Sequence, residues 1–195
     1  MYIMINTMGR QSEVTFWIAC FWRLNQNKRG ENGLNIANKR EFYIKRNLKR
    51  DFHECIVDIE KHPVVQQMKK YPHHGNTNCY QHCLKVAYYN YLICNIFGLR
   101  AREAARAGML HDLFLYDWHT HAKKTGAHFH GLTHPKTAME NAQKNFQLSE
   151  VEKDMVLKHM WPLTIIPPRY PESFVICLID KYCCICEIIG HLIHR

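Results

Sequence analysis

From Glu41 to the C-terminus, the apolar residues recur at steps of three and four, which is the spacing of amphipathic helices. No segment has the strict apolar–polar alternation that is typical of a half-buried strand. The helical pattern is interrupted only by residues that favour turns, namely Pro72 to Gly75, Gly98, Gly126, Gly131, Pro162 and Pro167-Pro168. The sequence therefore predicts an all-α fold.

The expected helices have recognisable starts. Ser149 and Glu152 have the spacing of a capping box, and Pro135 suits a first helical turn. The predicted helices span residues 41–50, 52–70, 78–97, 101–111, 134–146, 150–160 and 172–190. A long loop, 112–132, remains between them, and loops of this length are often functional. We expect its histidines at 119, 121, 128 and 130 to be exposed to solvent rather than to act as ligands.

The positive charge of the chain is concentrated at its N-terminal end. Of the formal net charge of +9, residues 1–50 carry 10 basic against 3 acidic side chains, so the remainder is nearly neutral. We expect a basic, partly ordered N-terminal extension over residues 1–40 and one helical domain over residues 41–195. Residues 10–50 contain no recognisable nucleic-acid-binding motif, so nucleic acid is not the expected partner.

The sequence indicates a cytoplasmic protein without a membrane anchor. The longest apolar run, Val14 to Trp22, is far shorter than the roughly 20 residues that span a bilayer, and no signal-peptide cleavage site follows it. The nine cysteines are odd in number, and Cys183-x-x-Cys186 has no second pair that would complete a zinc site. We expect them to be reduced thiols.

Several polar residues lie on the apolar faces of these helices. His82 shares a face with Val86 and Ile93, and His111 follows a stripe of small residues and directly precedes Asp112. Asp180 lies within a long apolar run, where a carboxylate is costly unless it is paired or binds a metal.

His134 and His159 repeat this pattern, since each lies on an otherwise apolar helical face. Together the six side chains supply imidazole nitrogen and carboxylate oxygen, a donor set that suits Zn, Fe, Mn, Co or Ni rather than Ca. One ion would leave positions open for water and substrate. With two ions, which we favour, Asp112 can bridge while His134 and His159 hold the second ion.

The order His82, His111-Asp112, His134, His159, Asp180 resembles the signature of the HD superfamily of metal-dependent phosphohydrolases over roughly residues 62–188. The two additional histidines are similar to those of its binuclear branch, which includes bacterial diadenosine tetraphosphate hydrolases. The stretch 74–82 looks like an uncharacterised bacterial HD subfamily, and the Gly-Tyr-Pro element of the cyclic-dinucleotide phosphodiesterases is absent. The resemblance implies a compact HD-type helical bundle.

The implied activity is hydrolysis of a phosphate ester or anhydride of a small molecule, expected to be a nucleotide, by metal-activated water. Asp112 would bind metal and orient the nucleophile, and Asp117 would assist proton transfer or else only cap the loop. Lys85, Lys181 and His74 are candidates for binding the substrate anion. His74 could equally belong to an ordinary turn, and Lys85 and Lys181 could equally be solvated lysines at helix surfaces.

Two other functions remain open. The inositol and phosphonate oxygenases of the HD superfamily bind two irons through the same ordered ligands, so the chain could be a diiron oxygenase acting on a phosphonate or a polyol. The other alternative is a non-catalytic HD module that binds a nucleotide or a partner. Loss of a ligand would be the mark of that module, and the sequence has the full ligand set.

Overall fold

The computed structural model describes residues 34–118, 120 and 130–193, in which seven α-helices and no strands occur. The elements are α2 (Leu34–Glu60), α3 (Pro63–Gln66), the 3-10 helix η2 (Gln67–Lys70), α4 (Cys79–Ile96), α5 (Ala101–Leu110), α7 (His130–Asn145), α8 (Glu150–Lys158) and α9 (Pro171–Ile193). The all-α prediction is therefore confirmed. The chain divides into two compact units, 1–46 and 47–195, and helices α3 to α9 belong to the second.

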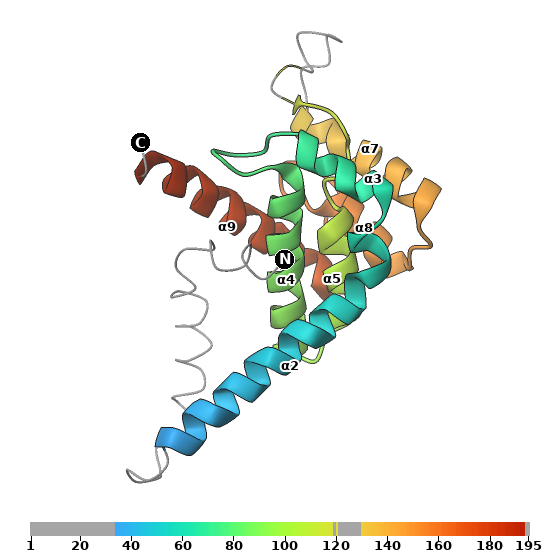
Figure 1. Cartoon of the computed structure of the whole chain (residues 1–195). Helices are drawn as coiled ribbons and strands as arrows, with labels where there is room; N and C mark the ends of the chain where they lie inside the picture. Colours follow the sequence, from blue (N-terminus) through green and yellow to red (C-terminus); the bar gives the residue numbers. More distant parts are fainter. Residues whose placement is uncertain (1–33, 119, 121–129, 194–195) are drawn as a thin grey trace. The chain divides into compact units, whose positions relative to one another are not determined.

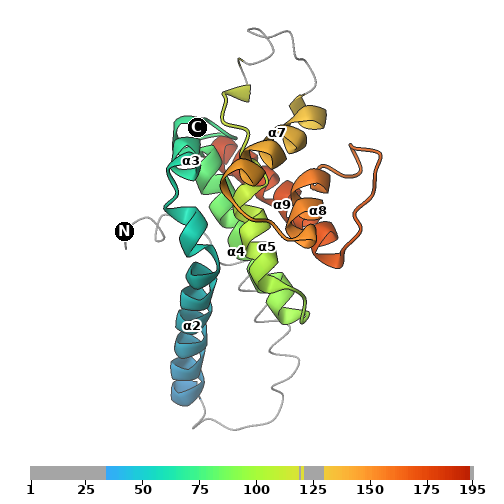
Figure 2. The same ribbon diagram turned by 90° about the vertical axis from the view of Figure 1, so that its right-hand side faces the viewer.

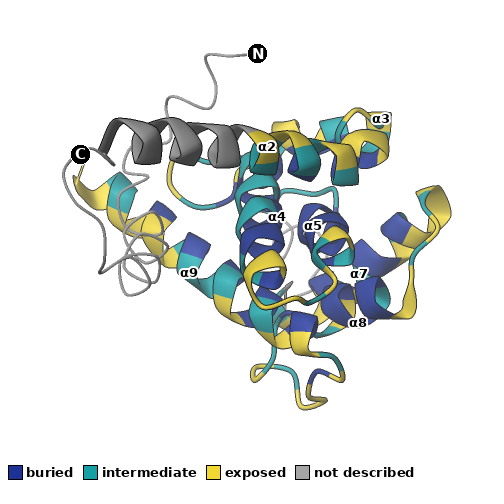
Figure 3. Ribbon diagram, turned by 90° about the horizontal axis from the view of Figure 1, so that it is seen from below, coloured by how far each residue is buried: buried dark blue, intermediate teal, exposed yellow. Residues whose placement is uncertain are grey.

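Helices α4 and α5 lie side by side at the centre of this unit (Figure 1). Gly108 of α5 permits their close approach, since a Cβ atom at this position would lie 2.6 Å from Cα of Ala87 in α4. Most of α5 is buried (Figure 3), including Ala104, Ala107 and Leu110. The residue that follows α5 is therefore held deep inside the protein.

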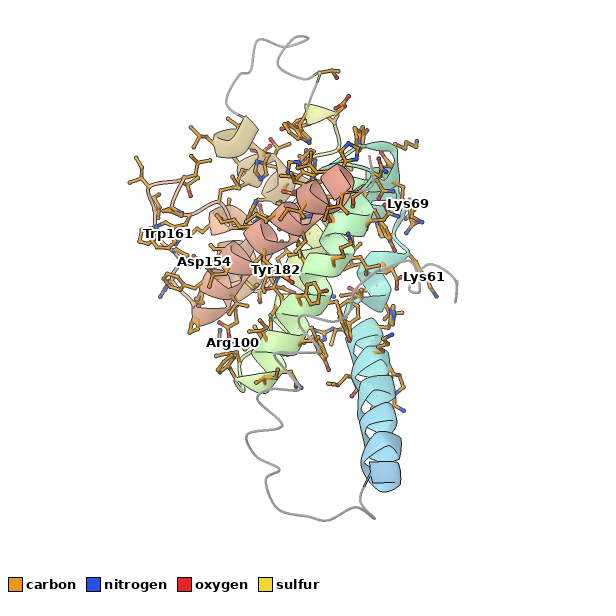
Figure 4. The ribbon with its side chains drawn as sticks, turned by 90° about the vertical axis from the view of Figure 1, so that its left-hand side faces the viewer. Lys61, Lys69, Arg100, Asp154, Trp161 and Tyr182 are labelled. Atoms are coloured by element: carbon orange, nitrogen blue, oxygen red, sulfur yellow. The ribbon has the colours of Figure 1, made fainter. Side chains whose placement is uncertain are left out.

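Helices α7, α8 and α9 complete the core around this pair (Figure 2). Asp154 joins α8 to the start of α9 (Figure 4), because its Oδ2 accepts hydrogen bonds from Ser173 Oγ at 2.7 Å and from the backbone N–H of Arg169 at 2.9 Å. In the same way, Arg106 of α5 pairs with Glu152 of α8 and Asp58 of α2, each at 2.7 Å. Polar side chains thus fix the relative positions of the helices.

Two capping boxes set the start of helices that carry candidate ligands. The predicted box of Ser149 and Glu152 is confirmed at the start of α8. A second box, which sequence reasoning missed, joins Asn78 and Gln81 at the start of α4. Each satisfies two backbone donors at a helix end, and this fixes where α4 begins relative to His82.

The predicted boundaries were wrong for three helices, 41–50, 52–70 and 134–146. Residues 41–50 and 52–60 form one continuous helix, and the break comes at His62, whose side chain accepts from the N–H of Val64 just after Pro63. Helix α7 begins at His130, four residues earlier than predicted, so Pro135 lies inside it. A proline in the second turn removes one backbone hydrogen bond, and α7 nevertheless continues past it to Asn145.

None of the helices in the described part of the chain is both long and apolar enough to cross a membrane. The cysteines between Cys55 and Cys186 are free thiols.

Candidate metal centre

Six buried side chains from five helices or their ends converge in the centre of the unit. All are less than a tenth exposed to solvent. They are His82 in α4, His111 and Asp112 at the end of α5, His134 in α7, His159 at the end of α8 and Asp180 in α9. The structure therefore brings together every residue that the sequence analysis proposed as a metal ligand.

The first group of donors surrounds Asp180. Its Oδ1 lies 3.1 Å from Nε2 of His82 and 3.5 Å from Nε2 of His111. Oδ2 of Asp112 lies 3.7 Å from the same nitrogen of His111. His82, His111 and Asp112 each offer one ligand atom, and these atoms lie within 4.8 Å of one another, close enough to surround a single ion.

The second group surrounds the other oxygen of Asp112. Its Oδ1 lies 3.2 Å from Nε2 of His134 and 3.6 Å from Nε2 of His159, and these two nitrogens are 2.8 Å apart. Asp112, His134 and His159 form a second set of ligand atoms within reach of one ion. The two oxygens of Asp112 therefore face two different groups of nitrogen donors.

The backbone around Asp112 holds its side chain in this central position. Its carbonyl accepts hydrogen bonds from the thiol of Cys79 at 3.3 Å and from the N–H of Phe114 at 2.8 Å. Asn141 of α7 donates to the carbonyl of Leu113 at 2.8 Å. The turn that follows α5 is thus attached to both α4 and α7, the helices that carry His82 and His134.

Two of the histidines have a defined tautomer. Nδ1 of His111 lies 2.8 Å from the carbonyl of Gly108, and Nδ1 of His159 lies 2.8 Å from the carbonyl of Val156. A carbonyl only accepts, so Nδ1 carries the proton in both rings. In its neutral form each ring then has a lone pair on Nε2, on the side that faces the cluster, and this is the form that binds metal.

The donor set fits a metal ion on the chemistry of these atoms. Nε2 of His111 is fully buried and makes no hydrogen bond to any described residue. Its lone pair instead faces carboxylate oxygens of Asp112 and Asp180, an arrangement that is repulsive unless positive charge lies between them. Nitrogen and carboxylate donors of this kind suit a divalent transition metal.

Both carboxylates of the cluster are held in the ionised form. Burial acts to raise the pKa of Asp112, but the nearby His111 and His134 hold it well below the usual range. Burial opposes ionisation of Asp180 as well, and the neighbouring His111 and His82 lower its pKa. Burial and the neighbouring His134 lower the pKa of His159 to about 3, so this ring is a neutral donor.

Two residues that sequence reasoning did not single out as ligands or partners lie against the cluster. His73 stacks on His82 with ring centroids 3.8 Å apart, and its Nε2 is 3.4 Å from Oδ2 of Asp112. Burial would lower the pKa of His73, but its hydrogen bonds to Asp112 and Glu187 raise it to about 10. Glu187, seven residues after Asp180 on α9, is 3.2 Å from Nδ1 of His73.

The predicted substrate-binding lysines have partners within the protein. Nζ of Lys85 lies 3.0 Å from Oε1 of Glu187. Nζ of Lys181 donates to the carbonyls of His159 and Cys177, both at 3.1 Å. Lys181 thereby satisfies a carbonyl at the end of α8.

Of the other two predicted residues, His74 lies beside the cluster and Asp117 lies in the loop after α5. His74 is half-buried and packs edge-to-face on His73 and on Trp118. Oδ2 of Asp117 accepts a hydrogen bond from Oγ1 of Thr120 at 3.1 Å, as a loop-capping residue would. Of the loop histidines expected to be exposed, those at 119, 121 and 128 lie outside the described residues, as does the side chain of His130.

A comparison with known proteins places this cluster in a family. No curated protein matches the chain. The family model of the HD domain matches residues 79–183, which is more than half of the chain and contains His82, His111, Asp112 and Asp180. HD domains bind divalent metals through such side chains. The chain therefore belongs to the HD-domain superfamily of metal-dependent phosphohydrolases.

Proposed function

We propose that this protein hydrolyses a phosphate ester or anhydride of a small molecule, with a nucleotide as the preferred substrate class. The position of Asp112 carries the proposal, since its two carboxylate oxygens face two groups of buried nitrogen donors. We further propose that two divalent transition-metal ions bind there. His82, His111 and Asp180 would hold the first ion, His134 and His159 the second, and Asp112 would bridge them.

The chemistry of the bound metals would be to neutralise charge on the phosphoryl oxygens and to lower the pKa of a water molecule toward neutrality. The protein contributes fixed donors. His111 and His159 present their Nε2 lone pairs without rearrangement, because helix carbonyls already hold each Nδ1–H. Preorganised donors in a buried site cost no reorganisation during the reaction.

Asp112 is also the proposed residue for orienting the attacking water, because both groups of nitrogen donors meet at its side chain. Asp117 stays a candidate for proton transfer to the leaving group, and its half-buried carboxylate lies five residues after Asp112. His74, Lys85 and Lys181 stay candidates for contacting the substrate anion. For the lysines, this role requires that the substrate compete with Glu187 or with backbone carbonyls.

The test is a substrate screen of the metal-reconstituted protein. Nucleoside mono-, di- and triphosphates, dinucleoside polyphosphates, cyclic nucleotides and generic phosphate esters are assayed for hydrolysis by chromatography of the products, with Asp112→Ala as the inactive control. We expect metal-dependent hydrolysis of at least one nucleotide and none by Asp112→Ala. Activity that survives in this variant would rule out the proposed site.

The same preparation separates the oxygenase alternative. A diiron oxygenase would consume oxygen when an organic phosphonate or a polyol is added and would leave every phosphate ester intact. We expect no oxygen consumption with these compounds, and consumption in the absence of any hydrolysis would reject the hydrolase assignment.

A further inference from the structure

Nδ1 of His82 has a different neighbour from Nδ1 of His111 and of His159. His111 and His159 each follow a helix and donate to a carbonyl of its last turn. His82 lies inside α4, where the backbone carbonyls are already engaged in the helix. Orientation of its imidazole therefore requires an acceptor from another part of the protein.

Glu187 provides the nearest acceptor. Its Oε2 lies 3.3 Å from Nδ1 of His82, although the N–H does not point along this line as in a full hydrogen bond. Glu187 lies on the same face of α9 as Asp180, two helical turns later. One helix thus presents two carboxylates to opposite nitrogens of one imidazole, with Asp180 at Nε2 and Glu187 at Nδ1.

His73 extends this contact to a second member of the cluster. The same oxygen of Glu187 lies 3.2 Å from Nδ1 of His73, while Nε2 of His73 is 3.4 Å from Oδ2 of Asp112. The rings of His73 and His82 are nearly parallel, 20° apart in plane. Glu187 therefore reaches His82 directly and Asp112 through His73.

The loop that carries His73 is attached to α9 beside Glu187. The backbone N–H of His73 donates to the carbonyl of Thr77 at 2.8 Å. Gly75 has φ of +59°, and a Cβ atom there would lie 3.2 Å from the carbonyl oxygen of Glu187 and 2.7 Å from Cβ of His191. Loop and helix thus touch without room for a larger side chain, which fixes His73 relative to Glu187.

The environment of Glu187 suits a residue that stays ionised. Its side chain is only 2% exposed, and Lys85 forms an ion pair with its other oxygen at 3.0 Å. Burial would raise the pKa of Glu187, but the hydrogen bond from His73, together with His82 and Lys85, lowers it. Keeping this buried carboxylate ionised costs free energy unless His73, His82 and Lys85 all remain beside it.

We propose that Glu187 and His73 are positioning residues that set the affinity of the first metal ion, the one assigned to His82, His111, Asp112 and Asp180. This inference rests on the proposed function, because it presupposes that the cluster binds metal. Removing a partner that orients a metal ligand typically weakens metal binding about 10- to 100-fold. His111 and His159 do not depend on Glu187, so the second ion should be affected far less.

The experiment is titration of the full-length apoprotein with Mn²⁺ by isothermal titration calorimetry. We expect two binding steps in the wild type. The step that disappears in His159→Ala is assigned to the second ion, and the other step to the first. In Glu187→Gln the affinity for the first ion should fall at least about 10-fold, while the affinity for the second stays within about 3-fold of the wild type. Glu150→Gln, the same change at an exposed position of α8, is the matched control.

His73 is tested by two substitutions. His73→Ala should weaken the first step as Glu187→Gln does, and His73→Gln, which keeps a side-chain donor, should restore part of the affinity. Circular dichroism and thermal melting show which variants fold. If His73→Ala does not fold, the titration of Glu187→Gln decides the outcome.

Two results would overturn the inference: wild-type affinity of both ions in Glu187→Gln, or equal weakening of both. Failure of the wild type to bind any Mn²⁺, Fe²⁺, Co²⁺, Ni²⁺ or Zn²⁺ would instead reject the proposed function.

Discussion

His111 and His159 occupy equivalent positions on two different helices. Each is the residue that ends its helix, and each holds its Nδ1 2.8 Å from the carbonyl three residues earlier. A helix end leaves carbonyls without partners, and in both cases the imidazole satisfies one of them. The same contact that completes the helix also turns the Nε2 lone pair into the cluster, so local helix chemistry and metal binding are linked.

The two histidines should therefore control different ions. His159→Ala is expected to lose one of two bound ions, because Asp112 and His134 alone are a poor site for the second. The measurement is metal content by inductively coupled plasma mass spectrometry after reconstitution. His53→Ala, at a half-exposed position of α2, should keep both ions. Two ions retained in His159→Ala would contradict the assignment.

Gly108 should tolerate no larger residue. Gly108→Ala places a Cβ atom 2.6 Å from Cα of Ala87, and forcing α4 and α5 apart costs about 1–3 kcal/mol of stability. A lower melting temperature by differential scanning calorimetry is the expected result. At Gly190 of α9 an added Cβ atom would meet nothing within 4 Å, so Gly190→Ala should be neutral or slightly stabilising. Equal melting temperatures for the two variants would refute this account of helix packing.

Asp154 should make stability depend on acid pH. Burial acts to raise its pKa, but contacts with Lys158, Arg169 and Ser173 lower it. A lowered folded-state pKa gives stability that is fully present above the unfolded value of about 4 and is lost as pH falls through the folded value. Asp154→Asn should thus be less stable than the wild type at neutral pH, with the gap narrowing below about pH 4. Urea unfolding of both proteins at neutral pH and below about pH 4 measures this difference in the free energy of unfolding. A difference that does not change with pH would contradict the role given to the Asp154 carboxylate.

Arg106 should be needed mainly to neutralise Glu152. Arg106→Met leaves this carboxylate buried and without its cationic partner, which typically costs about 3–5 kcal/mol. Changing both residues, in Arg106→Met/Glu152→Gln, should recover part of the loss. Free energies of unfolding in urea give the comparison. A double variant no more stable than Arg106→Met alone would show that the lost packing of the arginine, and not the unpaired charge, is responsible.

The convergence of the candidate ligands could be predicted from sequence because most of them lie on, or directly follow, an apolar helical stripe. His82 and Asp180 are the clearest cases, since a polar residue in such a run requires a partner. The same periodicity could have identified Glu187, which shares the α9 face of Asp180 and is likewise buried. Its position near the chain end, among exposed isoleucines, obscured that signal.

Loop residues carry no comparable pattern. His73 and His74 are adjacent and identical in type, and only the fold distinguishes the buried one from its neighbour. The partners of Lys85 and Lys181 were also beyond sequence reasoning, because they belong to helices far away in the chain. The start of α7 was misplaced because Pro135 is usual in a first turn, whereas this helix begins at His130, four residues before the predicted start.

The most direct test of the central claim compares metal binding with hydrolysis in the same sample. The wild type and Asp112→Asn are loaded with Mn²⁺, dialysed and analysed for metal content and for hydrolysis of the nucleotide panel, measured by chromatography of the products. We predict two ions and metal-dependent hydrolysis for the wild type, and loss of both properties in Asp112→Asn. A wild-type protein that retains no metal, or that hydrolyses equally well with Asn at position 112, would contradict the account.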